Sequence, residues 1–355
     1  MKSQEQKDRI VFLYTRLPDY FFQCVKCFSD KYNLHCTIIR YSSDINAPYK
    51  IQSASKVNII DKTQFNSKES LFSYLSELNI KLLYLSGWGD KEYNHIARKF
   101  KTKIPVVLGL DNPWTSSLRQ KLATFFAKIY LKKHFNKVWV AGSSQATYAI
   151  KLGFSNKDII YNLYSADTDK FTYDPSRKVN FKIIYVGRFV KYKNPVFLAQ
   201  TFDKLKRKGF LKKWSLDLFG NGPELDKILE FKNNSIRVQN FIDPNELQEK
   251  IKSYDVFCLP SKDEHWGVAV HEAICSGLVL LNSNSVYANT EFLISGYNGY
   301  SYDINNVKEF EKALIKLDDL NKEQLHNMKR NSATLSNRIK KETWAANLMS
   351  LLEGE

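Results

Sequence analysis

Two glutamates in one short stretch have the spacing of a ligand-binding site. Glu264 and Glu272 lie within residues 260–282, with seven residues between them. The segment 261–267 predicts a loop and Val268 the start of a helix, so Glu264 lies in the loop and Glu272 about one turn into the helix. Backbone N–H groups at a helix start can bind phosphate, and a nearby carboxylate can accept hydrogen bonds from sugar or ribose hydroxyls. The alternative is a solvated carboxylate in a first helical turn.

A second group of residues suits a diphosphate. Gly187 and Arg188 follow a predicted strand, and Lys193 opens a helix five residues later. An Arg and a Lys at such a junction can neutralise the charge of a leaving nucleoside diphosphate. A lysine-rich surface loop is the alternative. Gly267, before the helix of Glu272, allows close approach of the backbone to a ligand. Gly220 lies in a tight glycine turn after another predicted strand, and this turn is expected to line the same site.

Strands and helices alternate along the chain and predict two doubly wound α/β domains. Short apolar runs rich in β-branched residues alternate with helix-period segments, and the pattern restarts after residue 178. The predicted strands are 10–14, 36–40, 82–85, 105–110 and 137–140, then 181–186, 215–219, 236–239, 256–259 and 278–281. The predicted helices include 67–78, 92–100, 195–206, 223–229, 244–252 and 268–276. Ligands of such sheets bind at the carboxyl ends of the strands, and two facing sheets would make a central cleft.

The restart of the pattern also sets the domain boundaries. We place the first Rossmann-like domain at residues 1–170 and the second at 171–336. The last helical stretch, 337–355, is expected to reach back to the first domain.

The positive charge of the chain is concentrated in one half. Of the formal net charge of +16, residues 1–165 carry 25 Lys+Arg and 12 Asp+Glu, or +13, and the other 190 residues carry 28 and 25, or +3. This asymmetry favours an acidic partner for the first half: an anionic membrane surface, nucleic acid or a phosphorylated substrate. A solvated basic surface is the alternative.

Other features of the sequence indicate a cytoplasmic protein. The polar first residues do not resemble a secretory leader, and no apolar run is long enough to span a membrane. The five cysteines, an odd and sparse number, favour a reducing compartment.

A predicted helix over residues 117–134 is amphipathic. Its apolar stripe comprises Leu118, Leu122, Phe125 and Ile129. Its adjoining basic face includes Lys121, Lys128 and Lys132. Aromatic side chains together with lysines suit docking on anionic lipid, which would place the first domain on the inner membrane face beside a lipid-linked sugar acceptor. The alternative is a stripe buried in the core with a solvated basic face.

The order and spacing of the motifs in residues 180–305 resemble the retaining glycosyltransferases of family 4, which have the GT-B fold of two Rossmann-like domains. The residues that carry the resemblance are G-R-x4-K from Gly187, F-G-x-G-P from Phe219, and P-S-x2-E-x-W-G-x4-E-A-x2-S-G from Pro260. A looser likeness extends over residues 80–171.

The resemblance implies a role for each matching position. Arg188 and Lys193 would bind the donor diphosphate, and Glu264 would meet the hydroxyls of the donor sugar. Glu272 would bind the ribose of the nucleotide.

The remaining donor contacts implied by the resemblance are backbone contacts. The base would be read near Phe241 and Ile242, and the diphosphate would lie near Gly267 and Val268 at the helix start. The turn at Gly220 would line the same site. Family members mostly need no metal, so we expect none here and no cofactor besides the UDP- or GDP-linked donor.

The first domain departs from the family pattern at two places. The first loop, Thr15-Arg16-Leu17-Pro18, lacks the usual glycines, and Leu110-Asp111 stands where many members have His-Asp. We therefore take Asp111 as the candidate catalytic residue on the acceptor side. The D-x-D formed by Asp167 and Asp169 lies in the predicted linker, a context that does not favour a metal site.

Taken together, these features predict a metal-independent retaining glycosyltransferase that moves a sugar to a hydroxyl of a saccharide or lipid-linked acceptor in surface polysaccharide or glycolipid synthesis. Two alternatives stay open. One is a nucleic-acid-binding protein that uses the basic half, although no recognised nucleic-acid module occurs. The other is an inactive relative that senses sugar nucleotides.

Overall fold

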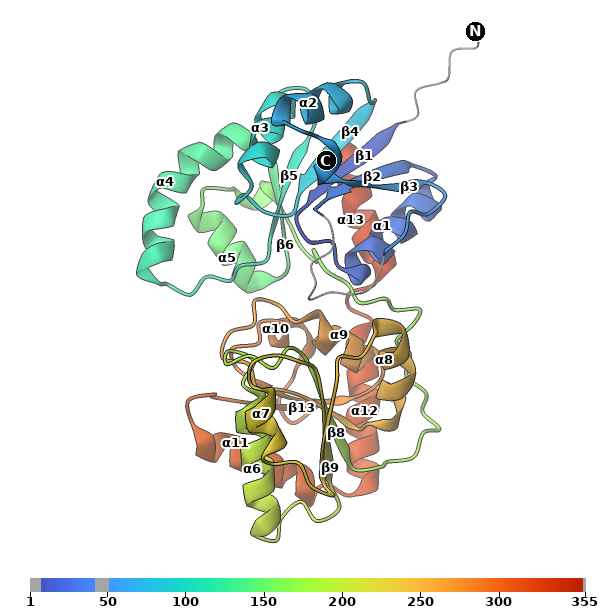
Figure 1. The fold of residues 1–355 in the computed structure, drawn as a ribbon, viewed down its shortest axis with the longest axis vertical. Helices are drawn as coiled ribbons and strands as arrows, with labels where there is room; N and C mark the ends of the chain where they lie inside the picture. The colour runs from blue at the N-terminus through green and yellow to red at the C-terminus, as the bar shows by residue number, and fades with distance from the viewer. Residues whose placement is uncertain (1–7, 42–50, 354–355) are drawn as a thin grey trace. The chain divides into compact units, whose positions relative to one another are not determined.

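The computed structural model describes residues 8–41 and 51–353 and divides into two compact α/β units (Figure 1). The first unit comprises Met1–Ser165 and Ile339–Glu355, and the second comprises Ala166–Arg338. The predicted boundaries, 170/171 and 336/337, were thus wrong by a few residues. The reason lies in the connection itself: the backbone N–H of Ala166 already donates to His271 Nδ1 of the second unit, at 3.0 Å.

The first unit is built on a seven-stranded, all-parallel sheet with the order β3-β2-β1-β4-β5-β6-β7. Its strands are β1 (Arg9–Tyr14), β2 (His35–Arg40), β3 (Val57–Asp61), β4 (Ile80–Leu85), β5 (Val106–Leu110), β6 (Lys137–Val140) and β7 (Ile159–Ile160). Its helices are α1 (Asp19–Tyr32), α2 (Lys68–Ser76), α3 (Lys91–Phe100), α4 (Leu118–His134), α5 (Ser143–Lys151) and α13 (Lys341–Glu353).

The second unit is built on a six-stranded, all-parallel sheet with the order β10-β9-β8-β11-β12-β13. Its strands are β8 (Lys182–Val186), β9 (Ser215–Phe219), β10 (Ile236–Gln239), β11 (Val256–Leu259), β12 (Val279–Ser283) and β13 (Gly299–Tyr302). Its helices are α6 (Pro195–Arg207), α7 (Leu225–Leu229), α8 (Pro244–Lys250), α9 (Val268–Cys275), α10 (Asn289–Phe292), α11 (Val307–Asp319) and α12 (Lys322–Ser336). Both units are therefore Rossmann-like, which confirms the predicted fold class.

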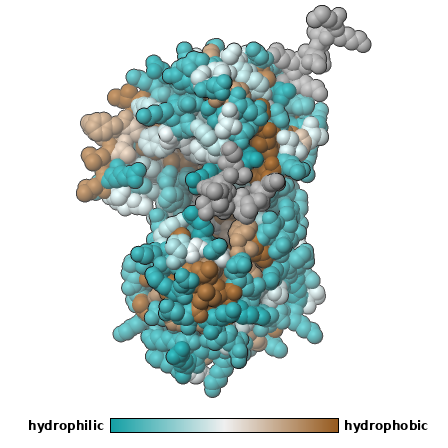
Figure 2. All heavy atoms as spheres, viewed as in Figure 1, coloured by the Kyte–Doolittle hydropathy of each residue, from teal (hydrophilic) through white to brown (hydrophobic). Residues whose placement is uncertain are grey.

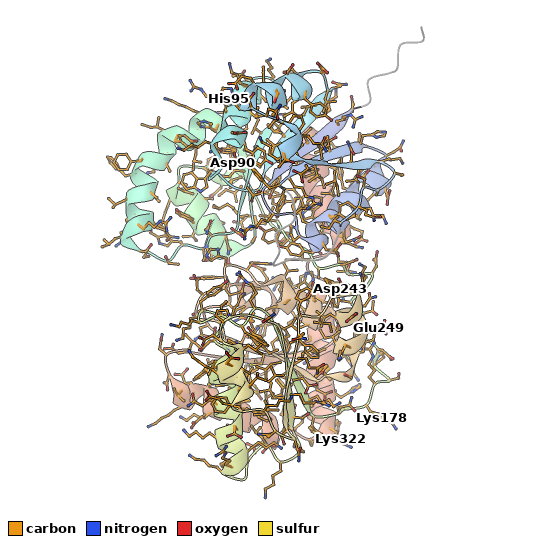
Figure 3. The ribbon with its side chains drawn as sticks, in the orientation of Figure 1. Asp90, His95, Lys178, Asp243, Glu249 and Lys322 are labelled. Atoms are coloured by element: carbon orange, nitrogen blue, oxygen red, sulfur yellow. The ribbon has the colours of Figure 1, made fainter. Side chains whose placement is uncertain are left out.

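Side-chain caps fix where several helices begin. Asp90 precedes α3 and accepts hydrogen bonds from the backbone N–H groups of Glu92 and Tyr93, each at 2.9 Å (Figure 3). Asp243 precedes α8 and accepts from the N–H of Asn245 at 2.8 Å (Figure 3). Each carboxylate satisfies N–H groups that have no partner within the helix, and its charge complements the helix dipole.

The C-terminal helix α13 packs on the first unit beside α1 (Figure 1). Trp344 is fully buried there, donates its indole N–H to the carbonyl of Leu163 at 2.8 Å, and stacks on Trp139 with ring centroids 4.7 Å apart. Helix α13 thus completes the core of the unit that begins with β1.

None of the helices that the structure describes is both long and apolar enough to cross a lipid bilayer.

Candidate functional site

The candidate donor residues lie at one edge of the second sheet. The strand order runs outward from β8 to β9 and β10 on one side and from β11 to β12 and β13 on the other. Consecutive crossovers therefore go in opposite directions from the β8–β11 pair. In open parallel sheets, ligands bind outside the carboxyl ends of the strands at such a switch point. Arg188 and Lys193 follow β8, and Glu264 follows β11.

Lys193 and Glu264 meet across this switch point. The Lys193 ammonium forms an ion pair with the Glu264 carboxylate, and only 18% and 12% of the two side chains are exposed. The backbone of the same two loops is also joined, because the N–H of Lys262 donates to the carbonyl of Tyr192 at 2.7 Å. A carboxylate and an ammonium, separated in sequence by 71 positions, are thus held as one unit.

Tyr192 organises the two cations. Arg188 donates a hydrogen bond to the Tyr192 hydroxyl. The Arg188 guanidinium and the Lys193 ammonium lie 5.7 Å and 5.8 Å from the centroid of the Tyr192 ring, within the range of a cation–π interaction. The exposed arginine and the partly buried lysine therefore share one aromatic contact, which keeps two positive charges close together.

Tyr185, near the end of β8, contacts the loop that carries Arg188. Its hydroxyl donates to the backbone carbonyl of Arg188 at 3.0 Å. Burial raises the pKa of Tyr185 well above its usual value, and the charge of Glu264 raises it further. The phenol therefore stays protonated and keeps the arginine backbone in place.

Gly220 is a glycine because the backbone of a neighbouring loop lies close to it. A Cβ atom at this position would lie 1.9 Å from the carbonyl oxygen of Gly187, so no other residue fits while the loops after β8 and β9 stay where they are. Those loops are hydrogen-bonded to each other, with Gly187 N–H donating to Phe219 O at 3.0 Å and Phe189 N–H to Asn221 O at 2.8 Å.

Gly267 and Val268 form the start of α9 beside Glu264. Gly267 has a φ of 91°, a left-handed conformation that favours glycine, and a Cβ there would lie 3.1 Å from Glu264 Cγ. No side chain caps this helix start among the described residues. Its first N–H groups and positive dipole end lie next to the Glu264 loop, an arrangement that suits an anion. Glu272 is half-buried in the second half of the same helix.

The two residues predicted to lie near the base differ in exposure. Phe241 and Ile242 follow β10 at the same sheet edge; the Phe241 ring is 47% exposed, and Ile242 is 6% exposed. Phe241 therefore offers a free aromatic face, whereas the Ile242 side chain belongs to the core and can contribute only its backbone.

Asp111 lies in the first unit, directly after β5. Its carboxylate accepts a hydrogen bond from the Tyr164 hydroxyl at 3.3 Å, and its backbone carbonyl accepts from the Gln145 side chain at 3.2 Å. Burial raises the pKa values of Tyr14, Tyr84 and Tyr164, and the charge of Asp111 raises each further. The carboxylate is therefore surrounded by protonated phenols.

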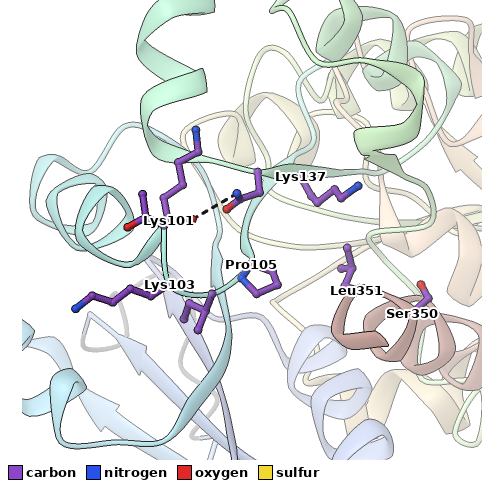
Figure 4. Close-up of a pocket in the computed structure, with 9 residues that line it drawn as sticks. Lys101, Lys103, Pro105, Lys137, Ser350 and Leu351 are labelled. Atoms are coloured by element: carbon purple, nitrogen blue, oxygen red, sulfur yellow. Dashed lines mark hydrogen bonds between the residues drawn. The ribbon is translucent and has the colours of Figure 1, made fainter. Parts of the chain in front are cut away.

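The first unit also has a pocket at the opposite edge of its sheet. Its volume is about 360 Å³, and its lining includes Lys101, Pro105, Asn136, Lys137 and Leu351 (Figure 4). The Asn136 side chain is part of this lining and donates to the carbonyl of Lys101 at 3.4 Å. Lys101 and Pro105 precede β5, and Asn136 and Lys137 lie at the start of β6. The pocket therefore lies at the amino ends of these strands, away from the ends where parallel sheets bind ligands.

No group of three or more His, Cys, Asp or Glu side chains that could hold a metal occurs among residues 8–41 and 51–353. Asp167, of the D-x-D sequence, is 5% exposed and lies 3.6 Å from the ammonium of Lys170. This carboxylate is thus paired with a lysine within the second unit.

Sequence reasoning gave no role to Tyr192 or Tyr164. Tyr192 lies inside the stretch that contains Arg188 and Lys193, and its position between two cations was the available signal. Tyr164 had no such signal, because it lies 53 positions from Asp111 and only the sheet brings the two together.

A comparison with known protein families bears on the second unit. Residues 169–334 match the family described as Glycosyl transferases group 1. This match covers nearly the whole of the second unit, which is therefore similar to the group 1 glycosyl transferase domain. The Lys193–Glu264 pair and the start of α9 lie inside the matched residues.

Curated relatives of this chain are distant, and each matches only part of it. A UDP-N-acetylglucosamine–peptide N-acetylglucosaminyltransferase GtfA subunit of Streptococcus pneumoniae is 27% identical over 135 residues, 37% of this chain and 26% of that protein. A UDP-Gal:alpha-D-GlcNAc-diphosphoundecaprenol alpha-1,3-galactosyltransferase of Escherichia coli is 26% identical over 148 residues, 40% of this chain and 38% of that protein. The chain thus spans well under two thirds of the length of either relative.

Solved structures match the whole chain. HepE of Anabaena, solved in complex with UDP, has a TM-score of 0.76 at 14% identity and covers 98% of this chain and 100% of its own. The pneumococcal O-GlcNAc transferase GtfA, solved with UDP and GlcNAc, has a TM-score of 0.73 at 12% identity, with coverages of 98% and 99%. At this identity the likeness concerns the fold, which is GT-B.

Proposed function

We propose that this protein transfers a sugar from a nucleoside-diphosphate sugar to an acceptor hydroxyl, with retention of the anomeric configuration. The observation that carries the proposal is the joined Arg188–Tyr192–Lys193–Glu264 group at the switch point of the second unit. It presents two cations and a carboxylate beside a helix start, and these are the partners that a diphosphate and a sugar require. Retention and the UDP- or GDP-linked nature of the donor rest on the resemblance to family 4.

Donor binding would exchange the partners of Lys193. Its ammonium forms an ion pair with the Glu264 carboxylate in the structure, so the two side chains neutralise each other. A donor diphosphate would attract Lys193 and Arg188, and the released Glu264 carboxylate would accept hydrogen bonds from sugar hydroxyls. In this proposal the ion pair positions both groups for the incoming substrate.

The proposed reaction is a displacement on the face of the sugar that the leaving group occupies. The bond between the anomeric carbon and the phosphate oxygen breaks, the acceptor oxygen bonds to that carbon, and the acceptor's proton passes to the leaving phosphate oxygen. Arg188, Lys193 and the N–H groups at the start of α9 would stabilise the negative charge that develops on the diphosphate. No step needs a metal ion, and we propose Asp111 as the group that orients the acceptor hydroxyl.

The acceptor that we propose is a saccharide carried on a lipid, in the assembly of a surface polysaccharide or glycolipid. Two observations support it: the basic first half of the chain, and the name of the E. coli relative, which specifies a diphosphoundecaprenol-linked substrate.

A thermal-shift screen tests donor binding. We would compare UDP, GDP, ADP and their common sugar conjugates, because a ligand at one hundred times its Kd stabilises a protein by about 2.7 kcal/mol. One nucleotide class should shift the unfolding temperature of the wild type and of the control variant Lys208→Ala, which removes an exposed charge after α6, but not of Arg188→Ala. No shift with any nucleotide would refute donor binding, and a shift without transfer or hydrolysis would indicate a sugar-nucleotide sensor.

A further inference from the structure

Helix α4 turns an apolar side toward solvent. The side consists of Leu118, Leu122, Phe125, Phe126, Ile129 and Tyr130, which are between 40% and 78% exposed. Figure 2 shows apolar side chains gathered along the outer side of this helix, at the upper left of the view. We call these six residues the α4 apolar face. The expected alternative, a stripe buried in the core, is wrong for this helix.

Different residues attach α4 to its own unit. Ala127, Leu131 and His134 are its buried side chains, and Ala127 and Leu131 belong to the hydrophobic core. At 3.6 residues per turn these positions lie on the side of the helix opposite to Leu122 and Ile129. The helix is thus apolar on two sides, one packed and one unpacked, and an unpacked face with six large apolar side chains marks an interaction site.

The segment that contains α4 carries only positive charges. No Asp or Glu occurs from Asn112 to Lys157, whereas this segment contains eight basic residues. Five of them are exposed on α4 itself: Arg119, Lys121, Lys128, Lys132 and Lys133. Among these, Lys121, Lys128 and Lys132 follow one another along a single side of the helix, next to the apolar face.

This distribution of charge indicates which partner would bind the α4 apolar face. A second copy of the chain would bring two sets of cations together with no carboxylate of the same segment between them, and that repulsion opposes a dimer through this face. An anionic lipid surface offers both partners at once: acyl chains for the exposed leucine and phenylalanine side chains, and phosphate groups for the lysines beside them.

We propose that the α4 apolar face docks the protein on an anionic membrane surface. The helix lies in the plane of the membrane, with Leu118, Leu122, Phe125 and Ile129 inserted at the boundary between headgroups and acyl chains. Lys121, Lys128 and Lys132 then bind lipid phosphates, with their aliphatic stems along the apolar boundary. That the membrane supplies the acceptor rests on the proposed function, whereas docking itself depends only on α4.

Vesicle co-sedimentation tests the docking. The probes are vesicles of phosphatidylcholine alone and vesicles of phosphatidylcholine and phosphatidylglycerol in equal amounts. Wild-type protein should bind the anionic vesicles at least tenfold more tightly than the neutral ones. Lys121→Gln/Lys128→Gln/Lys132→Gln should weaken binding about a hundredfold, the effect of three lysines near an anionic surface.

A second variant tests the apolar contribution. Phe125→Ser/Phe126→Ser changes two exposed side chains and should weaken binding to anionic vesicles at least tenfold. The matched controls change the second unit in the same way: Phe210→Ser, at an exposed phenylalanine, and Lys208→Gln/Lys212→Gln/Lys232→Gln, at three exposed lysines. Both controls should bind the anionic vesicles as the wild type does.

Two results would overturn the proposal. One is equal, negligible binding of the wild type to both kinds of vesicle. The other is a wild-type dimer in solution that Phe125→Ser/Phe126→Ser converts to a monomer, because the face would then be covered by a second copy. The nucleotide thermal shift, measured on the same samples, separates this test from the proposed function: vesicle binding without any nucleotide shift would support docking and refute the donor site.

Discussion

Lys193 and Glu264 show how much of this site is decided by single side chains. Each is largely shielded from solvent and each neutralises the other. Neither can therefore be removed without leaving a partly buried charge alone, and the two removals should have opposite effects on nucleotide binding.

Lys193→Ala should lower kcat/KM at least tenfold, because it removes one of the cations that would stabilise the leaving diphosphate. The measurement is the initial rate of transfer with the donor identified by the thermal-shift screen. Lys208→Ala, which removes an equal charge at the exposed residue just after the end of α6, should keep the wild-type rate. An unchanged rate in Lys193→Ala would refute the role of this lysine.

Glu264→Gln should lower kcat at least tenfold but strengthen the binding of free nucleoside diphosphate. The amide cannot neutralise the Lys193 ammonium, so the lysine is left without a charged partner and binds the diphosphate more tightly. Calorimetric titration of the nucleotide checks the affinity, and single-turnover transfer checks the rate. Weaker nucleotide binding in this variant would contradict the exchange of partners.

At the scale of elements, the candidate site depends on loops that are hydrogen-bonded to one another. The loops after β8 and β9 exchange backbone hydrogen bonds, and Gly220 allows their contact. The core of the first unit likewise depends on a distant element, because it includes helix α13 from the C-terminal end of the chain.

Gly220→Ala should weaken nucleotide binding at least tenfold, since the new methyl group collides with the Gly187 carbonyl and must displace the loop that carries Arg188. Gly89→Ala is the control, because nothing lies within 4 Å of the Cβ position at Gly89. Calorimetric titration of both variants compares them, and wild-type affinity in Gly220→Ala would show that the loop can move without loss.

Trp344→Ala should lower the free energy of unfolding of the first unit by about 3–5 kcal/mol, the usual cost of removing a large aromatic side chain from a core. The cavity would open beside Trp139 and Phe21, which both contact the indole. Glu342→Ala, at an exposed position of the same helix, should change it by about 0.5 kcal/mol or less. Chemical denaturation measures both, and a cost below about 1 kcal/mol for Trp344→Ala would contradict the structural role of α13.

At the scale of the whole molecule, the two proposed activities belong to different units. The donor residues lie in the second unit and the α4 apolar face in the first. Arg188→Ala should therefore lose the nucleotide shift and keep wild-type vesicle binding, and Phe125→Ser/Phe126→Ser should do the reverse. A variant of either site that loses both properties without unfolding would show that the sites are coupled.

The sequence by itself determined the fold class and the strands that the proposed donor residues follow. Strands β9, β10 and β11 begin and end where the apolar runs predicted, because a short buried strand between turn residues is a local signal. The motifs after those strands then lie at one sheet edge by the geometry of parallel sheets. Strands β3 and β7 and helices α5 and α10 were not predicted. Only Val57 and Ile60 of β3 are buried, β7 has two residues, α10 has four residues, and α5 follows β6 after two residues.

Only the tertiary structure decided which side chains meet and which faces stay open. The Lys193–Glu264 pair and the Tyr164–Asp111 contact join residues 71 and 53 positions apart, and no local pattern encodes such distances. The same holds for α4. The hydrophobic periodicity of the segment predicted an apolar side, but periodicity alone cannot predict whether that side is buried or exposed. Because Ala127 and Leu131 suffice to pack the helix on its core, the larger stripe of Leu122, Phe125 and Ile129 is left to solvent.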